Sequence, residues 1–382
     1  MSGVLHIAES VTPGHVDRCA DAVAERLVDE ATTRFAGARC GIEVALSATE
    51  AVLQGYVLTL PPMDDSLFPR GYDVIDFASQ EDLTRVVNEA LADCGYVGTH
   101  AHPLDVRSHL LVDEIEDDEQ TNSVLSDDQV IVVGHATPIG AHANLPVEAF
   151  AAREAQRALF ECSLANSELL GPDGKVLLGL REYDNGEAVV EFLNVSIQHR
   201  KGVDYGSLYG LLGDPVSNAL RNVEGLVIPD GFSAREFVIN GRGDFIEGGV
   251  HGDTGLSGKK LVADLYGPRI PIGGGALSGK DQFKADRIGT LRARHIAVKL
   301  AAATGLAATV TLAWFPGESE PRGVQAELSD GRVLGRNEIT QMTGVGDYTI
   351  AAAVDELLVM HSPWPVIQKR GYVGIGERWD RA

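Results

Sequence analysis

Two glycine-rich stretches that end in lysine lie close together in the last third of the chain, and they constrain it more than any other feature. The first spans 252–260 and reads GDTGLSGKK, and the second spans 273–281 and reads GGGALSGKD. Glycine permits tight turns and lets main-chain N–H groups approach an anion closely. In a chain of formal net charge −23, lysines gathered beside such loops indicate a polyphosphate site rather than a charged surface turn.

The second stretch is similar to a P-loop but departs from it in two ways. Residues 274–281 read G-x-x-x-x-G-K-D, whereas a P-loop ends in Ser or Thr, whose hydroxyl holds Mg²⁺. A P-loop also follows directly on a buried strand, and Pro268 and Pro271 interrupt any strand before this stretch. The pattern therefore indicates phosphate binding outside a P-loop architecture.

The start of the chain predicts an amphipathic helix with a polar first turn. Thr12-Pro13 is typical of a helix start, which would place His15 and Asp17 at the helix N-terminus. That end attracts phosphate, so a His there can donate to a phosphate oxygen and an Asp can hold a metal. The alternative is that His15 only caps the helix or lies on the surface. The apolar positions at helical spacing are Val16, Ala20, Val23, Leu27 and Ala31.

Taken together, these segments resemble the S-adenosylmethionine synthetase (methionine adenosyltransferase) family. That family opens with E-S-V-x-x-G-H-P-D-K, and residues 9–18 read ESVTPGHVDR, with Val16 and Arg18 in place of Pro and Lys. Its late signatures, G-D-x-G-L-T-G-R-K and G-G-G-A-F-S-G-K-D-x-x-K-x-D-R, are similar to residues 252–260 and 273–287. Shorter similarities follow in the family's order, so the resemblance covers most of the chain. They lie at 128–137, 172–175, 196–199 and 237–240.

The resemblance implies a reaction in which the sulfur of methionine attacks C5′ of ATP. The triphosphate leaves and is then hydrolysed to phosphate and pyrophosphate. Such a displacement needs positioning and charge stabilisation more than covalent help from the protein. The implied substrates are ATP and methionine or a related thioether. The implied cofactors are Mg²⁺, which prefers hard oxygen ligands and keeps phosphates in its shell, and K⁺ or another monovalent cation.

The resemblance also assigns roles to individual residues. It implies that Phe245 stacks on adenine, and that Asp128, Asp253 and Lys284 bind around the ribose and the amino-acid substrate. Asp173 and Asp253 join the ATP-binding set. The residues that it places on the phosphate side, in catalysis and ATP binding, are His15, Lys175, Lys259, Lys260, Lys280 and Lys284.

The resemblance assigns the metal ligands to three carboxylates. Asp17 and Asp286 match the family's Mg²⁺ ligands, and Glu43 matches its monovalent-cation glutamate.

The methionine side of the implied site departs from the family pattern. Tyr56 stands where the family has a methionine-binding glutamate, and Phe315-Pro316 replace its Ala-Ile pair. The family's flexible gating loop falls at 113–123, which is short and acidic here, and Gln120 is the nearest counterpart of its methionine-contacting glutamine. Lys259 replaces an Arg, and the exchange matters because Arg is planar and bidentate toward phosphate.

Three functions remain open at this stage. The chain is an S-adenosylmethionine synthetase, a relative that adenosylates another nucleophile or only cleaves ATP to triphosphate, or a nucleotide-binding subunit without catalysis. The last is disfavoured, because a non-catalytic relative has no need of every charged residue of the phosphate side. All of them are present.

Composition indicates a soluble cytoplasmic enzyme without a membrane or nucleic-acid partner. The chain has 382 residues, 44% of them hydrophobic, which is enough for two or three domains with their own cores. We expect no signal peptide and no membrane span, because no apolar run reaches the required length. Four scattered cysteines indicate reduced thiols, and the acidic excess argues against nucleic acid.

Hydrophobic patterning predicts an α+β fold, and the resemblance implies three similar α+β domains with pseudo-threefold symmetry. The expected domains span 1–114, 124–243 and 244–382, in a homodimer or homotetramer with the active site between subunits. A helix is predicted over 79–94, with a Ser79/Asp82 capping box and Gly95 as its stop. Further helices are predicted at 145–162 and 288–303, and strands at 42–46, 106–112, 129–133, 176–180, 188–199 and 308–314, with a hairpin turn at 184–186.

Overall fold

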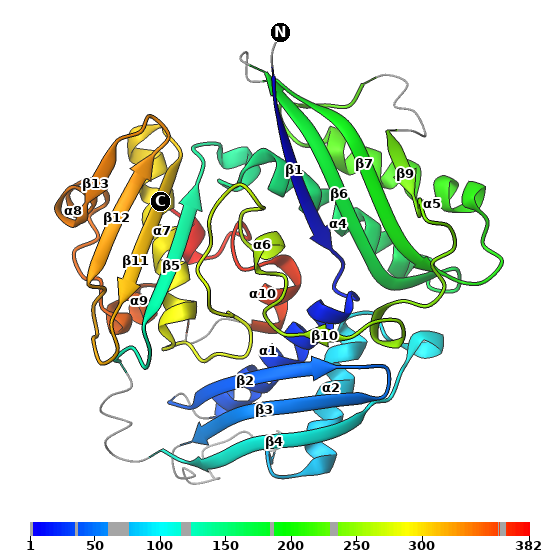
Figure 1. The fold of residues 1–382 in the computed structure, drawn as a ribbon, viewed down its shortest axis with the longest axis horizontal. Coiled ribbons are helices and arrows are strands. Elements are labelled where there is room, and N and C mark those ends of the chain that lie inside the picture. The colour runs from blue at the N-terminus through cyan, green and yellow to red at the C-terminus, as the bar shows by residue number, and fades with distance from the viewer. Residues whose placement is uncertain are drawn as a thin grey trace.

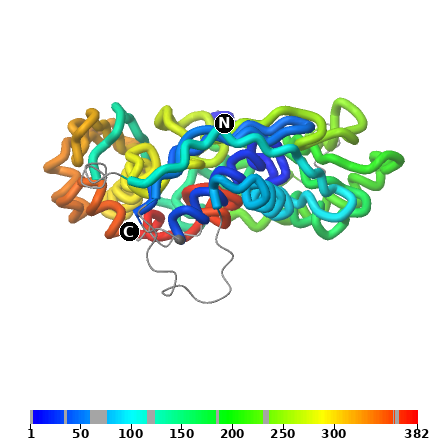
Figure 2. Tube along the Cα trace, turned by 90° about the horizontal axis from the view of Figure 1, so that it is seen from below, coloured from blue at the N-terminus to red at the C-terminus, as the bar shows by residue number. Residues whose placement is uncertain are grey.

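Three β-sheets, each covered by helices on one face, build the chain (Figure 1). The computed structural model describes residues 3–34, 37–59, 76–115, 124–183, 187–229, 236–357, 359 and 364–382. Seen edge-on, the molecule is flattened, and the blue and cyan strands run along one side with helices beneath them (Figure 2). The predicted α+β class is therefore confirmed.

The first sheet has the strand order β1-β6-β7-β8, and β9 also pairs with β7. It joins β1 (Gly3–Val11), β6 (Leu170–Tyr183), β7 (Ala188–His199), β8 (Leu226–Val227) and β9 (Phe237–Ile239). Its first three strands are antiparallel, and β8 and β9 run parallel to β7. Helix α4 (Val147–Ala165) packs on β1 and β6, and α5 (Tyr205–Arg221) packs on α4.

The second sheet has the order β10-β2-β3-β4. Its strands are β2 (Arg39–Leu46), β3 (Glu50–Thr59), β4 (Asp105–Glu114) and β10 (Gly255–Leu256). Helices α1 (Val16–Arg34) and α2 (Gln80–Asp93) cover one face. Strands β3 and β4 are parallel, because the chain between them carries α2 across the sheet before it returns.

The third sheet has the order β13-β12-β11-β5. Its strands are β5 (Val130–Ala136), β11 (Ala308–Trp314), β12 (Gly323–Leu328) and β13 (Val333–Gly335). Helix α7 (Ala285–Thr304) is buried along most of its length and packs on β5 and β11, and α8 (Arg336–Thr343) and α9 (Ile350–Leu357) pack on α7. Short helices α6 (Leu261–Asp264) and α10 (Trp364–Arg370) lie in the centre between the sheets (Figure 1).

Most of the predicted elements are present; several extend beyond the predicted bounds, whereas β7 and β11 match them and α2 is shorter. Helix α2 begins after Ser79, whose side chain accepts a hydrogen bond from the Asp82 N–H, as the capping box predicted. Helix α1 begins at Val16 rather than at Thr12-Pro13, because a turn closed by the His15 N–H and the Thr12 carbonyl precedes it. The predicted turn at 184–186 lies outside the described residues.

The three sheets do not follow the order of the chain. Strand β1 pairs with β6, β10 pairs with β2, and β5 pairs with β11. Each sheet thus takes one strand from across the expected boundaries between 1–114, 124–243 and 244–382, and those boundaries stay a prediction. Within the ranges that the structure describes, no helix is both long and apolar enough to cross a membrane.

Candidate active site

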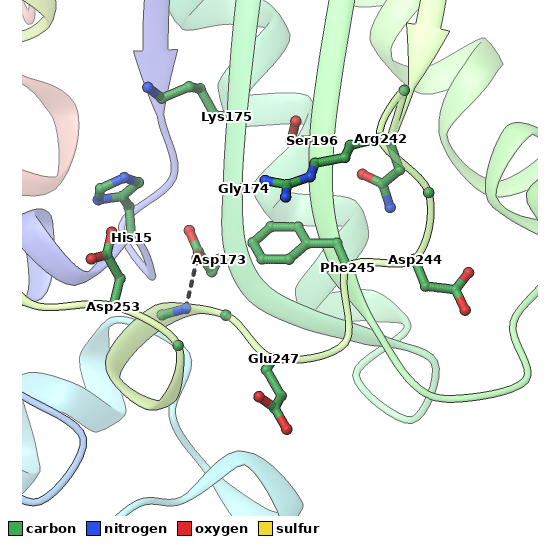
Figure 3. Close-up of a pocket in the computed structure, with 16 residues that line it drawn as sticks. His15, Asp173, Gly174, Lys175, Ser196, Arg242, Asp244, Phe245, Glu247 and Asp253 are labelled. Atoms are coloured by element: carbon green, nitrogen blue, oxygen red, sulfur yellow. Dashed lines mark hydrogen bonds between the residues drawn. The ribbon is translucent and has the colours of Figure 1, made fainter.

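A pocket of about 530 Å³ lies where the start of α1 meets β6 and the loop after β9. We call it the histidine pocket. His15, Lys175 and Asp253 lie on one side of it, Phe245 lies on the other, and Asp173 points into the space between (Figure 3). Five of the predicted site residues, separated by up to 238 positions in the sequence, therefore line one cavity. They are His15, Asp173, Lys175, Phe245 and Asp253.

His15 directly precedes α1 and is held by the helix start. Its Nδ1 accepts a hydrogen bond of 3.2 Å from the Asp17 N–H, so the neutral ring carries its proton on Nε2. Burial, followed by the charge of Lys260, lowers the pKa of His15 to about 4. At neutral pH His15 is thus an uncharged ring that caps the helix and can also donate from Nε2, which combines the two alternatives left by the sequence.

Asp17 is buried in the first turn of α1, two residues after His15, and it pairs with both lysines of the first glycine-rich stretch. Its carboxylate lies 3.2 Å from Lys259 Nζ and 3.0 Å from Lys260 Nζ, and it accepts a hydrogen bond of 3.0 Å from the Leu256 N–H. Burial alone would raise the pKa of Asp17, but the Leu256 N–H and the two lysines lower it. Asp17 therefore stays ionised and holds both ammonium groups beside the histidine pocket.

Asp173 and Phe245 are placed by close main-chain contacts. The Asp173 carboxylate accepts a hydrogen bond of 2.6 Å from the Gly249 N–H (Figure 3). A Cβ on Gly248 would lie 2.7 Å from the Phe245 ring and 3.1 Å from Asp173 Oδ2, so only glycine fits between the aromatic ring and the carboxylate. An aromatic face beside hydrogen-bonding groups suits a nucleobase, which stacks on such rings.

A second pocket, of about 500 Å³, lies on the second sheet beside the second glycine-rich stretch. We call it the lysine pocket. Lys280 pairs with Asp286, and Lys284 pairs with Asp127. The Lys284 ammonium also lies 5.2 Å from the centre of the Tyr56 ring. Burial alone would lower the pKa of Lys284, but Asp281 and Tyr56 raise it above its usual value. The other predicted residues that line this pocket are Glu43 and Asp128.

The structure thus divides most of the predicted residues between two pockets of one chain, whereas Asp17, Lys259 and Lys260 line neither. No lining residue is common to the histidine and lysine pockets among the described residues. The second glycine-rich stretch is fixed to the second sheet, because the Ile42 N–H donates to the Gly279 carbonyl at 2.8 Å. A Cβ on Gly279 would lie 1.9 Å from the Ile42 carbonyl oxygen, which explains the glycine there.

Several lining residues were missed by sequence analysis. Ser196, Arg242 and Glu247 line the histidine pocket, and Asp127 neutralises Lys284 in the lysine pocket. The signal for Arg242 was local, because it lies between Gly241 and Gly243, and Gly243 has φ of 108°. The 196–199 similarity contained Ser196 but gave that residue no role, and Ser196 reaches the pocket through its pairing with Lys175.

Each predicted magnesium ligand is a single carboxylate and not part of a group of protein ligands. Asp286 lines the lysine pocket and Asp17 lines neither pocket, and each is paired with lysine. Within the described ranges, no three His, Cys, Asp or Glu side chains are grouped to hold a metal. Mg²⁺ commonly takes one or two carboxylates and completes its shell with water and substrate phosphates. Asp17 and Asp286 could therefore hold it together with a polyphosphate.

Asp173 offers a test of its environment that does not depend on activity. Burial raises its pKa from 3.8 to about 6. The folded state then holds a proton that the unfolded state releases, so folding stability falls as pH rises from about 4 to about 6. An Asn at this position accepts the Gly249 N–H without a charge. We expect Asp173→Asn to be equally stable near pH 4 and more stable by about 3 kcal/mol above pH 7.

The measurement is urea unfolding of both proteins between pH 4 and pH 8. Asp253→Asn, an exposed neighbour in the same pocket, is the matched control for the loss of one carboxylate. A gain for Asp173→Asn that is the same at every pH would contradict the raised pKa.

Comparison with known proteins agrees with the sequence resemblance. Residues 247–381 match the family model described as S-adenosylmethionine synthetase, C-terminal domain. The chain is 32% identical over 346 residues to the S-adenosylmethionine synthase of Methylorubrum extorquens, covering 86% of this chain and 81% of that protein. It is 33% identical over 325 residues to the S-adenosylmethionine synthase of Acholeplasma laidlawii, covering 82% and 79%.

A solved structure shares the fold. It is described as an unusual S-adenosylmethionine synthetase from Campylobacter jejuni, and it matches with a TM-score of 0.81 over 99% of this chain and 97% of that chain, at 23% identity. The three helix-backed sheets therefore define the α+β fold of the S-adenosylmethionine synthetases, as the resemblance implied. With relatives above 30% identity over most of its length, the chain belongs to the S-adenosylmethionine synthetase family.

Proposed function

We propose that this protein is an ATP:L-methionine S-adenosyltransferase, which forms S-adenosylmethionine and releases phosphate and pyrophosphate. The observation that carries the proposal is the histidine pocket, where an aromatic ring, a neutral His donor and Lys175 converge. ATP would place adenine beside Phe245 and its phosphates toward His15 and Lys175. Donors fixed before the reaction stabilise charge on a leaving group without reorganisation.

The lysine pocket completes the proposed site from a second subunit. Lys280 and Lys284 would neutralise the triphosphate, and Asp286 would share Mg²⁺ with Asp17 of the other chain. Glu43 would hold a monovalent cation at the edge of the same pocket, and Asp128 would face the amino-acid substrate. These cations and carboxylates already pair with one another, so a bound metal and triphosphate would exchange partners with them rather than bury bare charges.

We infer a homodimer from the side chains that face away from the helices. Val176 and Leu178 are buried against α4, so Lys175 and Leu177 point to the opposite face of the first sheet. By the same alternation Glu43 points away from α1. Both pockets thus border the outer sheet faces, and a two-fold dimer through these faces would join the histidine pocket of one chain to the lysine pocket of the other. Exposed apolar side chains on the sheet strands support this interface: Leu5, Ile7, Leu111, Ile131 and Leu177.

Mass spectrometry of the products from ATP, Mg²⁺, K⁺ and methionine tests the proposed function. We expect S-adenosylmethionine together with phosphate and pyrophosphate. Triphosphate or adenosine without transfer to methionine would support an ATP-cleaving relative, and ATP binding without turnover would support a non-catalytic subunit.

The reduced state of the cysteines is compatible with a cytoplasmic enzyme, since all four are free thiols.

Tyr56 leads to a prediction about the nucleophile. Its ring lines the lysine pocket beside Lys284, in the place where the family carries a carboxylate for the ammonium of methionine. When a desolvated ammonium group lacks its carboxylate partner, the free energy of binding is weaker by about 2 kcal/mol. We therefore expect a high KM for methionine, and Tyr56→Glu should lower it by about tenfold or more.

The measurement is KM for methionine and a panel of S-alkyl homocysteines in both proteins, with Tyr56→Phe as the control that adds no charge. A low-micromolar KM in the unmodified protein, with strong discrimination against larger S-alkyl groups, would identify an ordinary methionine site and contradict the prediction.

A further inference from the structure

A third cavity, of about 270 Å³, lies apart from the two pockets of the proposed site. Its walls are the β1–α1 turn, α4, α6 and α10 with the residues that follow it. None of its described lining residues belongs to the histidine or lysine pocket. We call it the arginine cavity, because its basic lining residues are Arg18, Arg153, Arg157, Lys369 and Arg370.

The charge of this lining is opposite to that of the whole protein. Five basic side chains face the cavity together with only two acidic ones, Glu154 and Asp264, in a chain of net charge −23. On a surface dominated by carboxylates, such a concentration of positive charge is local and focuses field lines into a concave site. The lining therefore attracts small anions selectively.

Arg18 is a deeply buried cation, and two of its nitrogens make no hydrogen bond in the described structure. The residue is 3% exposed. Nη2 donates to the Gln368 carbonyl at 2.5 Å. Nη1 forms an ion pair with the Asp264 carboxylate at 2.5 Å but, like Nε, has no hydrogen-bond partner among the described residues. A buried donor left unpaired costs about 1–3 kcal/mol, so an acceptor that enters the cavity would gain from this group.

Arg153 is the second deeply buried cation, and its hydrogen bonds go to neutral main-chain carbonyls. It donates to the main-chain carbonyls of Val373 and Leu265 at 2.6 and 2.7 Å, and to that of Asp264 at 2.5 Å. Burial lowers its pKa to about 10. Two desolvated guanidinium groups thus share the carboxylate of Asp264. Asp21 lies near Arg18 as well, but burial raises its pKa to about 7, so it is only partly ionised at neutral pH.

The mouth of the cavity carries exposed cations. Arg157 is 65% exposed and pairs with Glu154 of its own helix. Lys369 lies 3.5 Å from Asp93, and exposed Arg370 donates to the Ile375 carbonyl at 3.2 Å. Exposed pairs of this kind contribute little to stability and can exchange partners with an entering anion.

The arginine cavity and the proposed phosphate site are built from neighbouring residues of the same two segments. Arg18 directly follows Asp17, and Pro13 lies two residues before His15 in the turn that enters α1. On the other wall, the Asp264 N–H donates to the Lys260 carbonyl at 2.9 Å. An anion held by Arg18 would therefore act on the two segments that position His15, Asp17 and Lys260.

We propose that the arginine cavity binds a small oxyanion with at least two negative charges and acts as an effector site next to the phosphate half of the active site. Guanidinium groups recognise phosphate and carboxylate oxygens in the same bidentate geometry. The same lining could therefore take inorganic phosphate, which the proposed reaction releases, or a polycarboxylate. The binding itself does not depend on the proposed activity.

Equilibrium dialysis with radiolabelled inorganic phosphate and with citrate, each without Mg²⁺, tests the proposal. The key variant is Arg157→Gln with Arg370→Gln, since both side chains are exposed and their loss leaves the fold intact. The matched control is Arg332→Gln with Arg336→Gln, which removes two arginines at the far end of the third sheet. A third protein, Lys280→Ala, removes a cation of the lysine pocket.

We expect the Arg157/Arg370 variant to bind the preferred anion at least about tenfold more weakly, about 1.4 kcal/mol. The control and Lys280→Ala should bind it as the unmodified protein does. Tighter binding of phosphate would show that the cavity prefers the anion that the proposed reaction releases, and tighter binding of citrate would show that it prefers a polycarboxylate. Loss of binding in Lys280→Ala but not in the Arg157/Arg370 variant would overturn the proposal, and so would the absence of millimolar binding of both anions.

Discussion

Replacing Lys280 with alanine should lower the rate of adenosyl transfer by about a hundredfold or more with the fold intact. Lys280 is the lysine nearest to Asp286 in the lysine pocket, and its main chain pairs with Gly41 of the second sheet. Removing one fixed donor that stabilises charge in a transition state typically costs about 2.7–4 kcal/mol. Its partly exposed ion pair contributes at most about 1 kcal/mol to stability, so the two effects are separable.

The measurement is the single-turnover rate of S-adenosylmethionine formation together with the thermal unfolding midpoint. Lys201→Ala, an exposed lysine in the turn after β7, is the matched control and should leave both values unchanged. If Lys280→Ala slows transfer by less than about tenfold, roughly 1.4 kcal/mol of barrier, the role of Lys280 at the triphosphate is wrong.

Mixing two inactive chains should restore activity. His15→Ala damages the histidine pocket and Lys280→Ala damages the lysine pocket. In a mixed two-fold dimer, one joint site would carry both substitutions and the other would carry neither, so such a dimer should have about half the activity of the unmodified dimer. Each variant alone should be nearly inactive, because every one of its sites carries one substitution.

The experiment is co-expression of the two variants with different affinity tags, followed by purification of the doubly tagged dimer. The control carries both substitutions in one chain and is paired with an unmodified chain, which should leave no intact joint site. An inactive mixed dimer would contradict a site shared between subunits. The two pockets of one chain would then have to act together, which their separate linings do not favour.

Local sequence signals predicted the elements that depend on neighbouring residues. Helix α2 has a hydroxyl cap at Ser79, a stop at Gly95 and apolar residues at helical spacing, and each of these acts within a few positions of the chain. The pairing of β1 with β6 joins residues such as Val11 and Lys175. No local pattern encodes such a partner, because an edge of exposed main-chain groups can pair with any strand that reaches it.

For the candidate site too, sequence analysis found the residues with local signals and missed what depends on the fold. The glycine-rich stretches and His15 stand out in the sequence, because glycine, lysine and histidine at these spacings have few structural alternatives. The sequence did not reveal that Lys280 and His15 line different pockets, since that depends on which sheet each loop joins. It also missed Asp127, an ordinary acidic residue until the fold places it beside Lys284.

The interleaving of strands has a consequence for how the protein is made. A ribosome delivers the chain from its N-terminus, and β1 emerges long before β6, its partner in the first sheet. Strand β2 also pairs with β10, and β5 pairs with β11, and both partners are synthesised much later. Contacts between distant segments slow folding and leave strand edges exposed in the meantime. Strand β1 can pair once β6 has emerged, whereas β5 has no partner strand among the described residues until β11 emerges. The third sheet therefore forms only after most of the chain has been synthesised.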